Sequence, residues 1–432
     1  MELIKYKLSD VAKVEISGVD KKTKEGEMSV KLCNFTDVYH NWTITKNLEN
    51  SFMQASANAN EIRRFSIKKG QVAFTKDSEK RDDIGIATYI ADDFDNVILG
   101  YHCALITPDD SKVSGAYINA FMQTYLIKKY FSDNASGSGQ RYTLTIDTMN
   151  NMPLFLPSLP EQKRIASILS ALDNKIALNR QINQNLEALA RQLYDYWFVQ
   201  FDFPDANGKP YKSSGGKMVY NLILKREIPE GWEGVALKNV IKHINTGLNP
   251  RDNFTFGGDI KYITVKNLTK DGYIDFSSCD TINEDARYKV HTRSQIEVGD
   301  ILYASICPLG RTYLITEEPK DWDINESVFS IRPNQKMITS EYLNMLLKDD
   351  YYIAKLSNSS TGSIFLGIRI KQLESTQILL PSYNILSAFT KQIKDIVRLQ
   401  ANNYQQILSL TKQRDELLLL LMNGQVNFDL LV

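Results

Sequence analysis

Two long segments of this chain carry an unbroken heptad pattern, and the two patterns match each other. Their seam residues, which step alternately by four and three along the chain, start and end 224 residues apart (389 − 165 and 421 − 197). The first seam contains Ile165, Leu169, Leu172, Ile176, Asn179, Asn183, Leu186, Ala190, Leu193 and Trp197, and the second contains Phe389, Ile393, Ile396, Gln400, Asn403, Ile407, Leu410, Arg414, Leu417 and Leu421. A period near 3.5 residues held over several turns predicts two helices that pair as a coiled coil.

Both seams are polar in their middle, at Asn179 and Asn183 in the first and at Gln400 and Asn403 in the second. A buried amide in a seam costs stability but restricts register and partner choice. An antiparallel pair places Asn183 opposite Asn403, whereas a parallel pair places Asn179 there. The seams alone fit both directions, and a third reading is that the amides are solvated where the helices splay.

The globular segments before the two helices also repeat each other. Collinear matches join Leu8, Val11 and Gly18 to Leu237, Val240 and Gly247, then Ile67, Gly70 and Val72 to Ile296, Gly299 and Ile301, and finally Pro108, Tyr117 and Pro157 to Pro333, Tyr342 and Pro381. The offset drifts by a few residues between blocks, as loop insertions make it drift. Matches in the same order over the whole length predict a duplicated unit.

Turn residues divide the chain into a regular order of parts. Short β-type runs fill residues 1–156 and 232–379, and the long helices fill 157–200 and 380–424. A Pro-, Gly- and Ser-rich stretch over 201–231 reads as a linker, and 425–432 as a tail. We therefore expect an α+β fold in which two β-rich domains alternate with two long helices.

The composition is that of an ordinary globular protein, with 43% hydrophobic and 24% charged residues among 432. A formal net charge of zero leaves nucleic-acid binding open, because basic patches can exist in a neutral chain. No apolar run is long enough to span a bilayer and no secretory signal is present, so we expect a cytoplasmic protein without a membrane partner. The cysteines lack zinc-site spacing and are expected to be buried hydrophobes: Cys33, Cys103, Cys279 and Cys307.

Motifs that would indicate catalysis are missing. The chain has no phosphate-binding loop of the Gly-x4-Gly-Lys-Ser/Thr type and no His-Glu-x-x-His. Its Asn249-Pro250 is followed by Arg251, which does not fit the Asn-Pro-Pro-aromatic motif of an amino methyltransferase. We therefore predict no catalytic residue, no metal site and no bound cofactor in this chain.

The start of the first helix resembles a known family. Leu156-Pro-Ser-Leu-Pro-Glu-Gln-Lys-Arg-Ile-Ala166, running into Asp173 and Asn179, is similar to the specificity subunit of type I restriction-modification systems. The resemblance implies two target recognition domains, each reading one half of a bipartite double-stranded DNA site. It also implies an antiparallel helix pair that sets the spacing between the halves and docks two methyltransferase subunits. Restriction subunits complete such a complex, with S-adenosylmethionine, ATP and Mg²⁺ bound by the partners.

The second helix departs from this pattern, because Leu380-Pro-Ser-Tyr-Asn-Ile385 lacks the Pro-Glu-Gln. We therefore expect the two copies to differ in their partner contacts. The residues expected to pair the helices or to meet a partner are Glu161, Gln162, Ile165, Leu169, Leu172, Asn183, Trp197, Phe389, Ile393, Asn403 and Leu417.

DNA readout needs Arg, Lys, Asn and Gln side chains near base edges, with hydroxyls for phosphates. The candidates are Arg63, Arg64, Lys76, Lys80, Arg81, Gln140 and Arg141 in the first domain, and Asn249, Arg251, Lys266, Asn267, Arg311 and Ser363 in the second. Arg311, which follows a strand that reads as buried, is the strongest of them. For each residue, a plain solvated surface position is an equally good reading.

Two other functions stay open at this point. The first is a non-catalytic structural adaptor, in which the two β-rich domains hold two protein partners without DNA readout and the coiled coil joins them; the neutral net charge fits that role. The chain also fits the recognition part of a system with one combined nuclease–methyltransferase chain.

Overall fold

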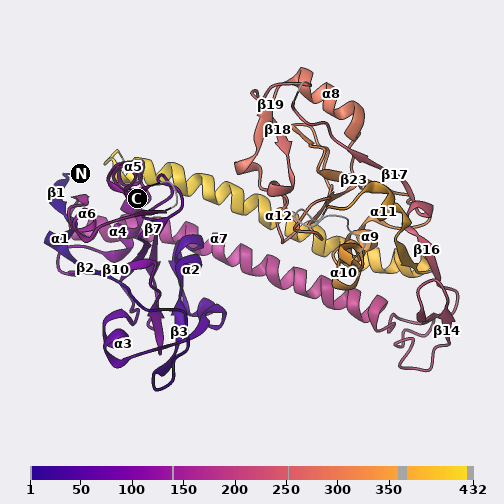
Figure 1. Cartoon of the computed structure of the whole chain (residues 1–432), viewed down its shortest axis with the longest axis horizontal. Coiled ribbons are helices and arrows are strands. Elements are labelled where there is room, and N and C mark those ends of the chain that lie inside the picture. Colours follow the sequence, from indigo (N-terminus) through magenta and orange to yellow (C-terminus); the bar gives the residue numbers. More distant parts are fainter. Residues whose placement is uncertain (1, 139–140, 252, 359–366, 426–432) are drawn as a thin grey trace. The chain divides into compact units, whose positions relative to one another are not determined.

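The computed structural model describes residues 2–138, 141–251, 253–358 and 367–425. The chain forms two compact units, one made of Met1–Arg180 with Tyr404–Val432 and the other of Gln181–Asn403. Each unit contains one β-rich domain and one stretch of each long helix, α7 (Leu159–Tyr194) and α12 (Tyr383–Met422), which are drawn in magenta and yellow in Figure 1.

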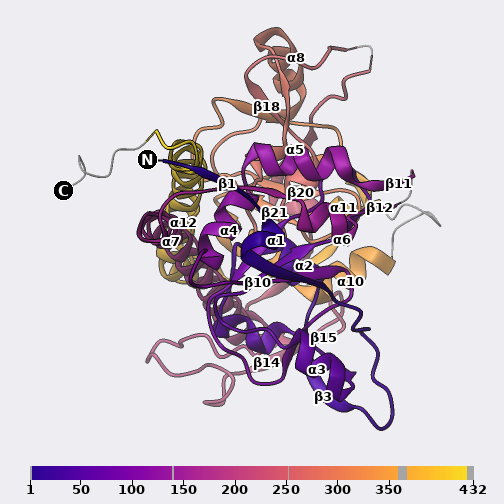
Figure 2. The same ribbon diagram turned by 90° about the vertical axis from the view of Figure 1, so that its left-hand side faces the viewer.

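The first domain is built on a five-stranded sheet in the order β2-β10-β6-β8-β4, in which only the β4–β8 pairing is parallel. A three-stranded sheet, β5-β3-β9, lies beneath α3, which Figure 2 shows next to β3. The elements are β1 (Ile4–Lys7), α1 (Leu8–Val11), β2 (Ala12–Ile16), β3 (Met28–Cys33), α2 (Phe35–His40), β4 (Thr43–Ile44), η1 (Lys46–Ser51), β5 (Met53–Ala57), α3 (Ala59–Phe65), β6 (Val72–Thr75), β7 (Asp77–Ser78), β8 (Ala87–Ile90), β9 (Val97–Leu99), β10 (Cys103–Pro108), α4 (Gly115–Met122), α5 (Tyr125–Asn134), β11 (Ser136–Ser138), β12 (Arg141–Thr143), α6 (Ile146–Asn150) and β13 (Pro153–Leu156).

The second domain repeats this plan with a four-stranded sheet, β17-β23-β20-β21, and a three-stranded sheet, β19-β18-β22. Its elements are the π-helical turn η2 (Asp195–Val199), β14 (Met218–Asn221), β15 (Arg226–Pro229), β16 (Glu233–Ala236), η3 (Leu237–Asn239), β17 (Ile241–Thr246), β18 (Ile260–Ile263), η4 (Val265–Asn267), η5 (Phe276–Ser278), β19 (Asp280–Ile282), α8 (Glu284–Ser294), β20 (Ile301–Ala304), β21 (Thr312–Leu314), β22 (Trp322–Ile324), β23 (Val328–Pro333), α9 (Ser340–Leu347), α10 (Asp350–Asn358), α11 (Ile370–Ser375) and β24 (Gln377–Leu380).

The two domains share a topology that confirms the predicted duplication. β3 pairs antiparallel with β5 and parallel with β9, and β18 pairs in the same way with β19 and β22. In both domains the strand that opens the repeated unit pairs antiparallel with the strand that precedes a long helix, β1 with β13 and β16 with β24. The predicted α+β class with two β-rich domains is confirmed with it.

One buried hydrogen bond is present in both copies. The Tyr117 hydroxyl of α4 donates to the Phe155 carbonyl at 2.8 Å, and the Tyr342 hydroxyl of α9 donates to the Leu379 carbonyl at 2.8 Å. Both tyrosines are fully buried, so burial raises the pKa of both phenols above its ordinary value. Each bond ties the helix of a domain to the strand that leads into a long helix.

The long helices pair antiparallel within each unit. In the first unit Asn179 Nδ2 donates to Gln406 Oε1 at 3.1 Å. In the second unit Asn403 Nδ2 donates to Asn183 Oδ1 at 3.0 Å, and Gln400 Nε2 donates to Glu187 at 3.2 Å. The antiparallel alternative, with Asn183 opposite Asn403, is therefore confirmed. The parallel alternative is wrong, and each of the four seam amides has a hydrogen-bond partner on the other helix.

The seam itself lies where the heptad pattern predicts it. Every predicted seam residue is buried or half-buried, whereas Leu178 and Leu189, which lie off the seam, are 55% and 51% exposed. The one charged seam residue, Arg414, lies with its guanidinium 4.4 Å from the Trp42 ring centre and 3.5 Å from the buried Asp173 carboxylate. Burial raises the pKa of Asp173, and the nearby Arg414 opposes that rise.

Two expectations from the sequence need correction. Residues 201–231 were expected to be a linker, but β14 and β15 form a hairpin there, and Phe203, Leu224 and Ile228 are buried in the core of the second unit. Burial of the aromatic and branched side chains of this stretch stabilises an ordered structure there, although turn-forming residues dominate its composition. Of the cysteines, Cys33 and Cys103 are buried as expected, but Cys279 is only half-buried and Cys307 is exposed. In the part of the chain that the structure describes, no helix is long and apolar enough to cross a membrane.

We predict that Tyr117→Phe and Tyr342→Phe each lower the free energy of unfolding by about 1–2 kcal/mol, because each leaves a buried carbonyl without its donor. Urea unfolding monitored for each variant measures the loss. Tyr383→Phe is the matched control, since Tyr383 also donates to a carbonyl, that of Gln335, but is 47% exposed. A loss at Tyr117 or Tyr342 no larger than that of the control would contradict the prediction.

Candidate functional site

A buried carboxylate gathers cationic side chains at one edge of the first domain. Asp77 begins β7, directly after the buried strand β6. Its Oδ2 accepts from Lys76 Nζ at 2.7 Å, lies 2.8 Å from His102 Nδ1 and lies 3.3 Å from Arg141 Nη2. Arg141 also contacts the His102 ring. Three basic residues from three parts of the chain therefore meet at one acid.

The charge state of Asp77 follows from these contacts. Burial raises its pKa, but the hydrogen bonds from His102 and Lys76 outweigh burial, so the pKa of Asp77 lies below its ordinary value. An ionised Asp77 fixes the positions of Lys76 and Arg141. The Arg141 side chain remains 55% exposed, so its other nitrogens are accessible to a ligand.

Two hollows open beside this cluster, and Asp77, His102 and Arg141 line both. One has a volume of about 560 Å³ and is also lined by Phe35, Tyr39, Ser78, Glu79, Lys80 and Asp83. The other has a volume of about 410 Å³ and is also lined by Lys76, Tyr101, Ser136, Gly137 and Thr143. Of the candidates in this domain, the structure thus brings together Lys76, Lys80 and Arg141.

The remaining candidates of the first domain have separate positions. Arg81 donates to the carbonyls of Ser132 and Asp133, which end α5, and so stabilises that helix end. Arg63 and Arg64 are exposed in the last turn of α3, where Arg64 pairs with Glu15 of β2 at 3.1 Å. Gln140 lies outside the described residues.

In the second domain the structure brings together Arg311 and the segment that carries Lys266 and Asn267. Arg311 Nη1 donates to the Leu268 carbonyl at 3.0 Å, just after η4. Lys266 is exposed, but Asn267 is buried, and its side-chain oxygen accepts from Thr264 N at 2.8 Å. Asn267 therefore stabilises its own turn, and this burial does not favour a DNA contact.

Asn249 and Arg251 lie on the loop after β17. Asn253 Nδ2 donates to the Asn249 carbonyl at 3.0 Å, which closes a tight turn that leaves Arg251 exposed. Ser363 lies outside the described residues. The assignment of all these residues to DNA contact stays a prediction.

The residues expected on the helices fall into two groups. Gln162 is buried and joins α7 to its own domain: its Oε1 accepts from Ser114 N at 3.0 Å, and its Nε2 donates to the Pro157 carbonyl at 3.0 Å. Glu161 accepts from Ser158 N at 3.1 Å at the helix start. The others pack in the seam or in the cores beside it, namely Ile165, Leu169, Leu172, Asn183 and Leu417, and Trp197 with Phe389, Ile393 and Asn403.

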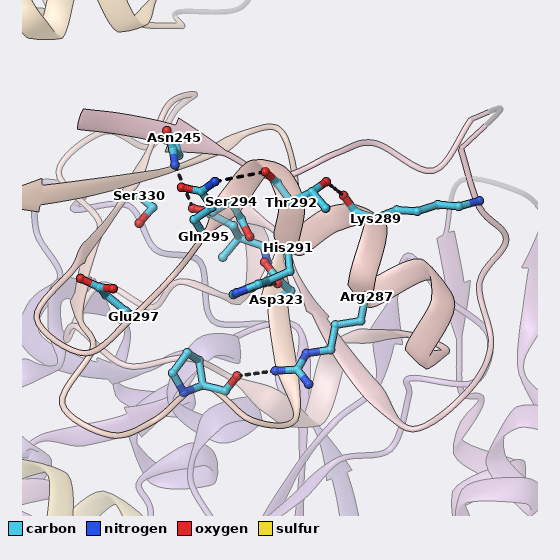
Figure 3. Close-up of polar contacts among 12 residues, drawn as sticks. Asn245, Arg287, Lys289, His291, Thr292, Ser294, Gln295, Glu297, Asp323 and Ser330 are labelled. Atoms are coloured by element: carbon cyan, nitrogen blue, oxygen red, sulfur yellow. Dashed lines mark hydrogen bonds and ion pairs between the residues drawn. The ribbon is translucent and has the colours of Figure 1, made fainter. Parts of the chain in front are cut away.

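A second acid–histidine pair, which was not predicted from the sequence, lies in the second domain. In Figure 3, His291 of α8 lies against Asp323 of β22, with Nδ1 3.0 Å from the fully buried carboxylate. The hydrogen bond that His291 donates to the Asp323 carboxylate raises the pKa of His291, against the effect of burial. His243 has the opposite shift, because burial and then Arg332 lower its pKa. Neither the Asp77–His102 pair nor the His291–Asp323 pair gave a spacing signal, because the two members of each pair lie 25 and 32 residues apart in the sequence.

The described residues hold no group of three or more His, Cys, Asp or Glu that is placed to bind a metal ion. The arrangement instead offers anchored cations and polar groups on two domains. Such groups contact phosphates and base edges, and they do no bond chemistry by themselves.

Comparison with known proteins gives a consistent result. Residues 4–188 and 229–417 match the family described as the type I restriction modification DNA specificity domain. The HindI type I restriction enzyme specificity subunit of Haemophilus influenzae is 24% identical over 84% of this chain and 87% of its own length. The MjaIX specificity subunit of Methanocaldococcus jannaschii is 28% identical over 75% of this chain and 72% of its own. The crystal structure of a type I S subunit from M. genitalium has the same fold, with a TM-score of 0.55 at 13% identity over 98% of this chain and 96% of that one.

We predict that His291 titrates at a higher pH than His243, because Asp323 stabilises its charged form. The stability from the His291–Asp323 pair is then fully present below the ordinary histidine pKa of about 6.5 and is lost as pH rises through the raised value. NMR titration of both rings measures the order. Asp323→Asn should lower the pKa of His291 and leave that of His243 in place. An unchanged His291 in that variant would contradict the assignment.

Proposed function

The chain belongs to the type I restriction-modification DNA specificity family and is its non-catalytic specificity subunit, and on this premise we propose that each domain reads one half of a bipartite DNA site. The observation that carries the proposal is the duplication itself. Two domains of one topology each present their own set of anchored polar groups, and each is joined to the same pair of helices.

The spacing between the half-sites is assigned to the helices. α7 contains 36 residues, which gives a length of about 54 Å at 1.5 Å per residue. One turn of DNA is about 34 Å, so a helix of this length is suited to readers that bind more than a turn apart. The paired seam amides support the role, because a fixed register gives a fixed spacing.

We assign the partners by the same reasoning. The complex contains two methyltransferase subunits and, where it restricts DNA, the restriction subunits. S-adenosylmethionine, ATP and Mg²⁺ bind to these partners, and the cytoplasm, where the DNA lies, is the place of action.

The surface assigned to a methyltransferase subunit is the outer face of α7 in the second unit. Ile182 and Leu189, seven residues apart on that face, are 37% and 51% exposed.

The proposed function predicts a gene-dependent methylation pattern. Genome-wide mapping of methylated adenines in the host should show a bipartite motif with a fixed central gap, and deletion of this gene should remove it. A strain that keeps the gene but lacks the motif would leave the adaptor without DNA readout as the better reading.

The partner assignment predicts that the double variant Ile182→Asp with Leu189→Asp loses its methyltransferase subunit. Two charges on an apolar contact are desolvated without a partner, which costs several kcal/mol. Size-exclusion chromatography of the co-expressed subunits measures assembly. Gln184→Asp, at an exposed position of the same helix, is the control and should assemble normally. Normal assembly of the double variant would place the contact elsewhere.

A further inference from the structure

Helix α8 of the second domain has a buried face and an exposed face of different chemistry. Ala286 and Val290 pack on Ile260, Tyr262 and Ile282 of the three-stranded sheet. The opposite face carries Tyr288, Lys289 and Thr292, all exposed. Tyr288 is 76% exposed, and within the described residues its side chain makes no hydrogen bond and no ring contact.

The loop after β17, which carries Asn249 and Arg251, is attached to this helix. Leu248 and Phe254 of the loop pack against the same small core as Ala286 and Val290. Lys289 Nζ donates to the Asn253 carbonyl at 3.2 Å, and Gly257 N donates to the Thr281 carbonyl at 2.8 Å. The loop and the helix therefore form one surface.

Charge is distributed unevenly along α8. Glu284 and Asp285 lie in its first turn, and the basic residues follow. The helix dipole alone favours that order, so charge by itself does not indicate a ligand. Tyr288, in the middle of the helix, adds an exposed aromatic ring beside Lys289. An amphipathic ring next to a cation suits a contact with a sugar or a base beside a phosphate.

The surroundings hold the second half of the helix firmly. In Figure 3, Thr292 Oγ1 donates to the Lys289 carbonyl, Arg287 donates to the Pro319 carbonyl, and His291 lies on Asp323. Lys289 points away from these contacts. These contacts order the side chains of the surface before a ligand binds, which lowers the entropy cost of binding.

The first domain has an equivalent helix. α3 covers β9 of its three-stranded sheet as α8 covers β22, and in both helices the next-to-last residue is an arginine that contacts another strand. Arg64 pairs with Glu15 of β2 at 3.1 Å, and Arg293 donates to Thr246 of β17 at 3.2 Å. The same structural position therefore presents basic residues in both copies.

We propose that the second half of α8, together with the loop Leu248–Arg251, is the DNA-contacting surface of the second domain. Lys289 and Arg251 contact phosphates, and Tyr288 lies against a sugar or base of the second half-site. This inference rests on the proposed function, and it adds a helix from which the sequence analysis selected no residue.

The test measures DNA affinity of the full chain in complex with its methyltransferase subunits, at several salt concentrations, by fluorescence anisotropy. Lys289→Ala should weaken binding about fivefold for every sequence and reduce the salt slope by about 0.9, the value for one lost phosphate contact. Tyr288→Ala should relax sequence preference in the second half-site alone, and Tyr288→Phe should retain most of it. Lys238→Ala, at an exposed position on η3 of the same domain, is the control and should bind as the wild type does.

Each other outcome has a distinct meaning. A selective wild-type complex with unchanged Lys289→Ala and Tyr288→Ala variants would overturn the inference. Loss of subunit assembly with unchanged DNA affinity would also overturn it, because α8 would then be a protein contact. A wild-type complex that binds all duplexes with the same affinity would instead overturn the proposed function. The wild-type measurement alone reveals this outcome.

Discussion

The antiparallel contact between α7 and α12 is the interaction on which the rest of the fold depends. Each unit completes its core with stretches of both helices: Ile165 with Leu418 and Leu421 in the first, and Trp197 with Phe389 in the second. An apolar seam alone would tolerate slips of one heptad. The amide pair Asn183–Asn403 makes such slips costly, because a shifted register leaves buried amides without partners.

The two copies of the duplicated unit share their scaffold but differ in their polar clusters. The tyrosine bonds, the closing strand pairs and the order of four strands, β2-β10-β6-β8 and β17-β23-β20-β21, are the same in both domains. The polar clusters are not: Asp77 with His102 lies at the end of β6 in one, and Asp323 with His291 joins a strand to α8 in the other. A scaffold that keeps its core while its exposed side chains vary is what two different half-sites require.

The sequence predicted the parts of the fold that depend on period. A heptad seam is a local pattern, and its repetition at one offset made the helices, the duplication and the burial of the seam residues predictable. The clusters could not be predicted, because Asp77, His102 and Arg141 come from separate segments of the chain that only the fold brings together. Asn267 was misleading for the opposite reason: its type fits base readout, but its own turn uses the side chain. Residues 201–231 were predicted to be a linker because turn-forming residues dominate this stretch, and its few large apolar side chains, which are buried in the core, form no periodic pattern.

The division of the chain into units has a consequence for synthesis. The second unit, Gln181–Asn403, is continuous in sequence, whereas the first needs Tyr404–Val432 in addition to Met1–Arg180. A nascent chain leaves the ribosome from its N-terminus. During synthesis the first unit therefore cannot complete its core until the segment from Tyr404 onward has left the ribosome. Until then the apolar face of Ile165 and Leu169 is uncovered, although the second unit can already fold. The last turns of α12 are thus the segment whose folding ends the exposure of this apolar face to chaperones and proteases.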